Sequence, residues 1–124
     1  MKSNKILVST LLAFGLMVGA LATPKMQAVF VKTYPAPKDS DLAKAKCTVC
    51  HVKGKELNVY GKDMQKALQE KKTKDLTAEI LKSIEKLDSD KDGVSNGDEL
   101  KAGTLPGDPK SKPAETKPAE GTTQ

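Results

Sequence analysis

Cys47-Thr48-Val49-Cys50-His51 is the stretch that decides how this chain folds, because it indicates what the domain is built around. Two thiols three positions apart lie on one face of a helical turn. The histidine that follows can bring its imidazole to a metal held against that face. Two cysteines at this spacing with a histidine directly after them form the attachment pattern of a c-type haem. The stretch therefore predicts one porphyrin, bound covalently through Cys47 and Cys50.

A Cys-x-x-Cys pair also has uses that need no haem. Two cysteines in an exported protein commonly form a disulfide, and a pair at this spacing can act as a redox dithiol. A structural zinc site is disfavoured because it needs about four nitrogen or sulfur ligands, whereas the chain has two Cys and one His. The disulfide and the redox dithiol stay open beside the haem hypothesis.

The run from Cys47 to His51 resembles the haem-binding run of cytochromes c. The resemblance implies that Cys47 and Cys50 bind the porphyrin and that His51 is the proximal ligand of the iron. It also implies an all-α fold, a small helical domain around one covalently bound haem c. Because His51 is the only histidine, we expect a single haem whose distal ligand is not histidine.

The distal iron ligand is the open part of this hypothesis. Common soluble cytochromes c use a methionine near the end of the domain, whereas here Met64 follows His51 by only 13 residues. Met64 lies on an apolar stripe at helical spacing, so it is our candidate, with packing in the core as the alternative. An empty position, a lysine, Tyr60 or Asn58 are the other options. We also expect Tyr60 to hydrogen-bond a haem propionate and Gly61 to let the backbone approach the ring, although ordinary helix packing would explain both.

A second pattern, over residues 88–99, predicts a bound Ca²⁺ ion. Oxygen donors stand at the first, third, fifth, seventh, ninth and twelfth positions, namely Asp88, Asp90, Asp92, the Val94 carbonyl, Asn96 and Glu99. Gly93 stands sixth, where a sharp turn is needed, so the stretch matches an EF-hand calcium loop. The sequence holds no second loop and resembles the isolated calcium loops of dockerin-like and thrombospondin-repeat-like modules. We expect a structural clip, and the competing interpretation is a solvated acidic turn.

The rest of the chain divides by composition. Helices are predicted from Asp39 or Ser40 into Cys50, over residues 57–71 and over residues 77–87, with a short turn from Asn96 to Gly103. Together they make a domain over residues 39–105, which contains no Trp and so few aromatic residues that the porphyrin would form part of its core. Three prolines favour an extended lead-in over residues 23–38. The tail over residues 106–124 is polar and proline-rich, and we expect it to be disordered.

The first residues indicate export. Lys2 and Lys5 precede an uncharged apolar run over residues 6–22, and Ala20-Leu21-Ala22 fits a cleavage site. We therefore predict a signal peptide over residues 1–22 and a periplasmic or secreted protein. An uncleaved N-terminal anchor is the alternative, because the run is close to the lower limit for a membrane span.

Charge and composition narrow the function. The net charge is +5, and all 21 basic residues are lysine. Without arginine, readout of nucleic-acid bases is disfavoured, whereas a mild positive charge can steer the protein toward an acidic redox partner. The sequence predicts an exported one-electron carrier stabilised by calcium, and no enzyme. The alternatives are a haem protein that binds a small ligand at an open sixth position and a calcium-binding interaction module without haem.

Overall fold

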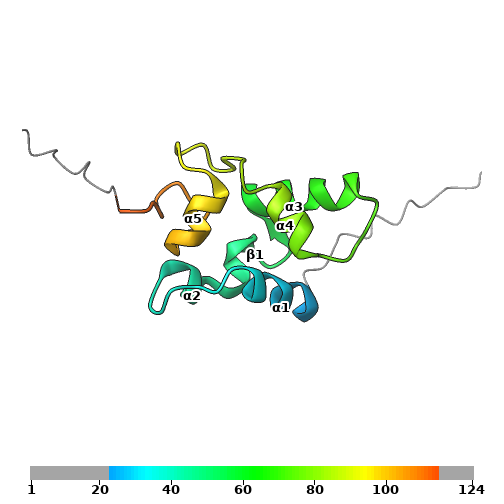
Figure 1. Cartoon of the computed structure of the whole chain (residues 1–124), viewed down its shortest axis with the longest axis horizontal. Helices are drawn as coiled ribbons and strands as arrows, with labels where there is room; N and C mark the ends of the chain where they lie inside the picture. The colour runs from blue at the N-terminus through cyan, green and yellow to red at the C-terminus, as the bar shows by residue number, and fades with distance from the viewer. Residues whose placement is uncertain (1–22, 115–124) are drawn as a thin grey trace, which may run out of the picture.

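A computed structural model describes residues 23–114 (Figure 1). The predicted signal peptide, residues 1–22, lies outside the described residues, as do residues 115–124. The elements in chain order are α1 (Pro24–Thr33), α2 (Asp41–Ala45), the 3₁₀-helix η1 (Lys46–Val49), β1 (His51–Lys53), β2 (Glu56–Leu57), α3 (Val59–Glu70), α4 (Ala78–Ser83) and α5 (Asn96–Ala102). In Figure 1, α1 and α2 lie along one side of the molecule and α3, α4 and α5 along the other.

The first helix, α1, stands where an extended lead-in was predicted. The Thr23 side chain caps it by accepting a hydrogen bond from the backbone N–H of Met26. Pro24 takes the first helical position, where the missing N–H of proline costs nothing. Phe30 and Tyr34, one turn apart, are buried with their ring centroids 5.5 Å apart. The prediction of an extended segment is therefore wrong for residues 24–33, because proline begins this helix and does not interrupt it.

A β-hairpin corrects the prediction of an all-α fold. Strands β1 and β2 pair antiparallel, with His51 opposite Leu57 and Lys53 opposite Glu56. Gly54 in the connection has a φ of 55°, a left-handed conformation that glycine adopts without steric cost. The first predicted helix also ends early, because Lys46 at a φ of 48° stops α2 before the cysteines. The described fold is therefore mixed, with five α-helices and one two-stranded sheet.

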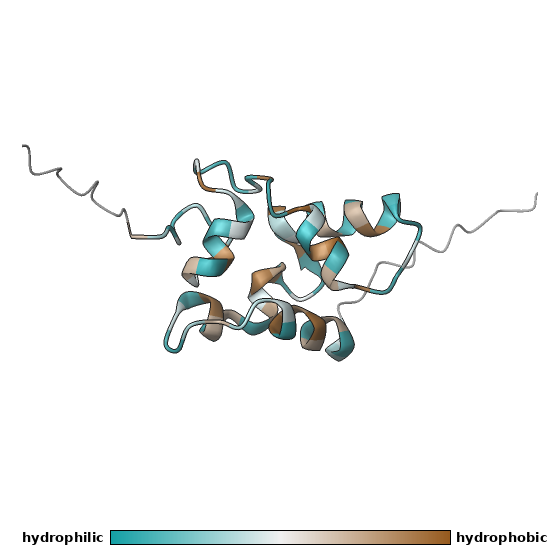
Figure 2. Cartoon of the chain, in the orientation of Figure 1, coloured by the Kyte–Doolittle hydropathy of each residue, from teal (hydrophilic) through white to brown (hydrophobic). Residues whose placement is uncertain are grey.

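The core lies where α1 and α3 pack against α4. Helix α3 begins at the cap Asn58 and buries Tyr60, Met64 and Leu68, which are four residues apart and so share one face. Helix α4 begins at the cap Thr77 and contributes Ile80 and Leu81. In Figure 2 the apolar segments gather on these elements, whereas the loop before α5 is mostly hydrophilic. The core therefore sits to one side of the predicted calcium loop.

Helix α5 follows the predicted calcium loop and is tied to the end of α4. The Ser95 side chain caps α5, and Gly103 ends it at a φ of 80°, the left-handed conformation that favours glycine. The backbone N–H of Gly97 donates to the carbonyl of Glu85 at 2.9 Å, and Leu87 accepts from Asn96 at 2.7 Å. These bonds fix the two ends of the loop relative to each other.

The chain stays packed beyond residue 105, where the ordered domain was expected to end. Pro106 and Ser111 are buried. The Ser111 hydroxyl donates to Asp41 in the first turn of α2 at 2.7 Å and accepts from the backbone N–H of Leu105 at 3.1 Å. Residues 105–112, the C-terminal segment, therefore fold back onto α2. The start of the predicted tail must move to a later residue, because Ser111 supplies polar contacts that a count of apolar residues does not register.

Candidate haem and calcium sites

The attachment turn, residues 47–51, holds the two cysteines in a geometry that suits double attachment. The backbone N–H of Cys50 donates to the carbonyl of Cys47 at 3.3 Å, closing a 3₁₀ turn. Side chains three residues apart are eclipsed in this conformation, so both thiols leave the same edge of the turn. Cys47 is exposed, Cys50 is half-buried, and both are free thiols.

Asn58 clamps the attachment turn to the start of α3. Its side-chain amide donates to the carbonyls of Thr48 at 3.2 Å and Val49 at 2.8 Å, while its backbone N–H donates to the carbonyl of Cys50 at 2.9 Å. Its side-chain oxygen accepts from the backbone N–H of Gly61 at 2.8 Å. Three consecutive carbonyls of the turn are thus satisfied by one residue. Because its amide is fully used, Asn58 is a clamp and is unsuited to be the distal iron ligand.

Gly61 allows the turn and α3 to meet closely. A Cβ atom at this position would lie 2.2 Å from the carbonyl oxygen of Cys50, closer than any non-bonded contact allows. The sequence suggested that Gly61 brings backbone close to a porphyrin. In the structure the group that it accommodates is the Cys50 carbonyl, so Gly61 serves the shape of the attachment turn.

Of the residues predicted to bind the iron or a haem propionate, His51 lies in the attachment turn, and Tyr60 and Met64 lie in the core. His51 is half-buried at the start of β1, and its Nδ1 atom is buried without a hydrogen-bond partner among the described residues. Tyr60 and Met64 lie one turn apart on the buried face of α3. The Tyr60 hydroxyl also lacks a partner within residues 23–114, and burial, followed by the nearby Cys50, raises the pKa of Tyr60 well above its usual 10.

The environment of Cys50 bears on the alternative of a redox dithiol. Burial, with a smaller contribution from Cys47, raises the pKa of the Cys50 thiol to about 12. A redox-active cysteine needs a lowered pKa so that its thiolate is available near neutral pH. The described turn therefore disfavours Cys50 as the attacking thiol and leaves a redox dithiol that reacts through the exposed Cys47 open. Two free thiols and an imidazole nitrogen without a partner among the described residues form a donor set that also fits a covalently bound haem.

The calcium loop, residues 88–99, gathers its acidic side chains at one point. Carboxylate oxygens of Asp88, Asp90 and Asp92 all lie within 4.8 Å of one another. Asp88 accepts from the backbone N–H of Asp92 at 3.1 Å and of Gly93 at 2.9 Å, and Gly93 has a φ of 95°. These backbone hydrogen bonds, of which that from Gly93 is the strongest, lower the pKa of Asp88. The loop thus wraps around its first aspartate.

Glu99 is the part of the calcium loop that most needs a cation. It is 0% exposed, and neither of its carboxylate oxygens has a hydrogen-bond partner among the described residues. Burial, and then the charges of Asp90, Asp92 and Asp88, raise the pKa of Glu99 to about 8. An unpaired buried carboxylate is costly in free energy. A Ca²⁺ ion would offset that cost, and three aspartates, a bidentate glutamate and the Val94 carbonyl would offer it about six oxygens.

Asn96 takes a different position from the one predicted. Its amide nitrogen donates to the carbonyl of Ile84 and to the hydroxyl of Ser89, both at 2.9 Å, and its oxygen accepts from the backbone N–H of Ser89 at 3.1 Å. The Asn96 side chain is therefore a buried brace between α4 and the loop, and the prediction that it binds the ion directly needs correction. Ser89 also donates to Asp63 of α3 at 2.6 Å, which joins the loop to the helix that carries Met64.

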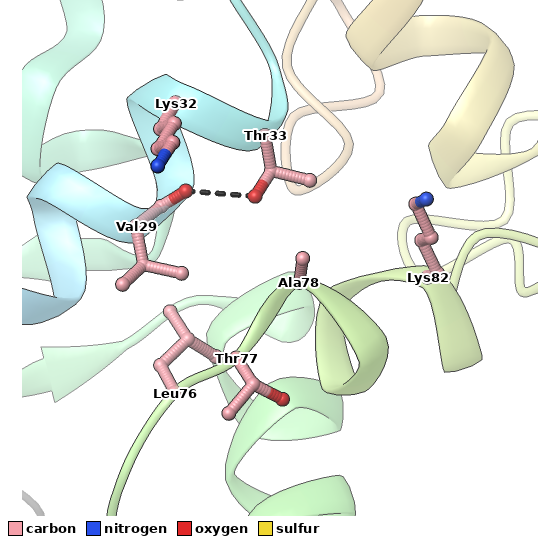
Figure 3. A pocket seen from close by; sticks show the side chains of 7 residues that line it. All are labelled: Val29, Lys32, Thr33, Leu76, Thr77, Ala78 and Lys82. Carbon is pink, nitrogen blue, oxygen red and sulfur yellow. Dashed lines mark hydrogen bonds between the residues drawn. The ribbon is translucent and has the colours of Figure 1, made fainter.

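A cavity of about 490 Å³ lies between α1 and α4 and is separate from both candidate sites. Figure 3 shows Val29 and Leu76 facing its interior, with Lys32 from α1 and Lys82 from α4 on different sides. The cavity is open to solvent, and no residue predicted to bind haem or calcium lines it.

Comparisons with known proteins do not assign a function to this chain. No protein-family model, curated protein or solved structure matches the chain. Within residues 23–114, no helix has both the length and the apolar character needed to cross a membrane.

Proposed function

We propose that this chain is an exported monohaem cytochrome c that carries single electrons and is stabilised by a calcium ion. The observation that carries the proposal is the attachment turn, in which the backbone N–H of Cys50 closes a turn onto the Cys47 carbonyl and His51 follows with a buried Nδ1 atom that has no partner among the described residues. When bound, the haem iron supplies a reversible one-electron change between its ferric and ferrous forms. The rest of the function depends on how the chain holds that group.

The residues of the turn have separate tasks in this proposal. Cys47 and Cys50 would hold the haem covalently, each thiol adding across one vinyl group, and the imidazole of His51 would bind the iron. Asn58 fixes the turn through three carbonyl groups, so the imidazole starts from a defined position. Tyr60 and Met64 present an apolar face of α3 that excludes water. Exclusion of water and the identity of the axial ligands are the means by which such a protein sets its potential.

Covalent attachment is the first thing to test. The chain should be exported with its own N-terminal segment from a host that matures c-type cytochromes, and then assayed as the pyridine haemochrome. We expect one haem per chain that resists acid–acetone extraction, and none in the Cys47→Ser/Cys50→Ser variant. Protein that folds, is exported and carries no covalent haem would overturn the proposal and leave the calcium-binding module as the function.

Met64 as distal ligand is a finer proposal with its own test. It is supported by the position of Met64 on the same face of α3 as Tyr60, whose pKa the nearby Cys50 raises, so this face lies next to the attachment turn. We expect Met64→Ala to lower the reduction potential and to admit carbon monoxide to the ferrous protein, with Met26→Ala as the control. If the wild-type protein is already high-spin and binds carbon monoxide rapidly, the sixth position is open and the protein binds a small ligand.

Calcium is the second bound group that we propose. Its support is the cluster of Asp88, Asp90 and Asp92 together with Glu99, a buried carboxyl group whose two oxygens have no partner among the described residues and whose pKa the three aspartates raise. The ion would be held by Asp88, Asp90, Asp92, Glu99 and the Val94 carbonyl, with Asn96 as a brace behind them. Since the loop joins α4 to α5 and reaches α3 through Ser89, a bound ion would hold three helices together.

A further inference from the structure

Gly107, in the C-terminal segment, lies directly against the side chain of Asn58. A Cβ atom at position 107 would lie 2.7 Å from both the Cγ and the Nδ2 atom of Asn58 and 2.8 Å from its Oδ1 atom. Non-bonded atoms do not approach so closely, so only a residue without a side chain fits over this amide. The φ of Gly107 lies outside the left-handed range. The contact with Asn58, and not the backbone conformation, therefore favours glycine here.

The Asn58 amide cannot move aside without releasing the attachment turn. Its nitrogen donates to the carbonyls of Thr48 and Val49, and its oxygen accepts from the backbone N–H of Gly61. Only one orientation of the amide offers the nitrogen to two carbonyls and the oxygen to the N–H. A shift or rotation forced by a larger residue at position 107 would therefore weaken all three hydrogen bonds.

The C-terminal segment is anchored on both sides of Gly107. Before it, the carbonyl of Gly103 accepts from the backbone N–H of Leu42 at 3.0 Å. After it, Ser111 is buried and its hydroxyl donates to Asp41 at 2.7 Å. Both anchors lie on α2. Gly107 is thus held against the Asn58 side chain by contacts that do not involve residues 47–51.

We infer that Gly107 is a positioning residue of the haem site, which holds the Asn58 amide in the orientation that fixes the attachment turn. This inference rests on the proposed function, because the turn matters through the haem that Cys47, Cys50 and His51 would bind. A bound group is held only as firmly as the residues behind its ligands allow. A segment that the sequence assigned to the polar tail therefore controls the backbone that carries both thiols and the imidazole.

Backbone hydrogen exchange, measured by NMR on the full-length exported protein, tests this contact. Gly107→Ala should raise the exchange rate of the Gly61 N–H about fivefold to tenfold, the factor expected when one hydrogen bond is lost. The N–H of Ile80, which donates to the cap of α4, should keep its rate. Lys110→Arg is the control variant, because it changes an exposed side chain of the same segment and keeps its charge. A Gly61 rate that Gly107→Ala leaves unchanged would overturn the inference.

Asn58→Ser separates an action through the amide from a general loosening of the segment. Serine keeps an oxygen for the backbone N–H of Gly61 but is too short to meet a methyl group at position 107. In this background Gly107→Ala should raise the Gly61 rate less than about twofold, and the double variant should fold even if Gly107→Ala alone does not. Equal increases, or loss of folding in both backgrounds, would contradict an action through Asn58.

The reduction potential distinguishes a positioning role from a purely structural one. In the haem-loaded protein we expect Gly107→Ala to lower the potential, because a looser turn admits water, which stabilises the more positively charged ferric form. Lys110→Arg should keep the wild-type potential. A Gly61 rate that rises while the potential stays unchanged would overturn the positioning role. If the wild type carries no haem, the proposed function is wrong, and the exchange rates alone decide whether Gly107 acts through Asn58.

Discussion

The attachment turn and the calcium loop are the two segments that we propose to bind a ligand, and they differ in how the protein satisfies their polar groups. In the attachment turn, Asn58 pairs with three consecutive carbonyls, so protein hydrogen bonds hold the backbone, and the Nδ1 atom of His51 is left without a partner among the described residues. In the calcium loop, Glu99 is buried with two unpaired oxygens. The backbone of the turn is therefore preorganised before any ligand binds, whereas the loop buries a carboxyl group that no described residue satisfies.

This difference indicates on which ligand the stability of the fold depends. Removing a ligand from a preorganised turn costs only the contacts with the ligand, whereas removing it from the loop restores the repulsion between carboxylates. Breaking the turn should therefore require a change in the protein chain, and breaking the loop should require only a chelator.

The largest effect should come from a methyl group placed between the turn and α3. We expect Gly61→Ala to lower the free energy of unfolding by about 3 kcal/mol, because its Cβ would meet the carbonyl oxygen of Cys50. Gly54→Ala is the control, since that glycine has a positive φ but no atom near its Cβ position, and should cost about 1 kcal/mol. Urea denaturation measures both, and equal losses would show that the turn does not press on α3.

Calcium removal should come next. At a free calcium concentration a hundredfold above Kd, binding stabilises the fold by about 2.7 kcal/mol, so a chelator should lower Tm by about 10 °C. Glu99→Gln should abolish this dependence and make the metal-free protein more stable, because an amide is neutral at every pH whereas Glu99 must take up a proton to be buried without the ion. Asp98→Asn, at an exposed neighbouring carboxylate, should keep the full response. Identical melting curves with and without chelator would refute the calcium clip.

Replacing Asn58 should lower the free energy of unfolding somewhat less, because water can hydrogen-bond to some of the carbonyls that its side chain satisfies. We expect Asn58→Ala to cost about 2 kcal/mol, the sum of a lost helix cap and of carbonyls left without a donor. Asn58→Ser keeps an oxygen for the backbone N–H of Gly61 and should recover about half of that loss. Equal losses in the two variants would mean that the cap contributes nothing, and full recovery in Asn58→Ser would mean that Asn58 acts only as a cap.

The stability of the metal-free protein should also depend on pH. The folded chain holds a proton on Glu99 up to a pKa of about 8, against an ordinary 4.5, and Asp90 is raised to about 6. The folded state therefore binds more protons in this range, so the stability should fall as pH rises from about 5 to 8. The lowered pKa of Asp88 acts only below its usual value of 3.8 and leaves the slope in this range unchanged. Denaturation in chelator across this range should show a decline that Glu99→Gln largely removes.

The sequence predicted the starts of α2 to α5 better than α1, whose residues were expected to be extended, and better than the segments between the helices. Ser40 and Thr77 cap the N-termini of α2 and α4, and Gly103 ends α5, as the sequence predicted. The hairpin after the cysteines escaped prediction because its strands have only three and two residues, too few to show an alternating pattern. Its one local signal was Gly54, which occupies the left-handed conformation in the connection.

Some predicted site residues lie where the sequence placed them, and others do not. The spacing of Asp88, Asp90 and Asp92 predicted a cluster that the structure forms, because a loop of fixed length brings alternate residues together. The side chain of Asn96 fits the same spacing but turns to Ile84 and Ser89, a choice made by tertiary contacts. The hydrogen bond from the Lys112 side chain to the Asp92 carbonyl could not be predicted, because Lys112 stands in a lysine- and proline-rich stretch and reaches the loop only when the chain folds back.

The intact mass of the exported protein, measured under denaturing conditions, tests the central claim most directly. The account predicts that the chain carries the mass of one haem through Cys47 and Cys50, and that both thiols are closed to alkylation. A chain at its unmodified mass with two alkylated cysteines, or with a Cys47–Cys50 disulfide, would contradict it.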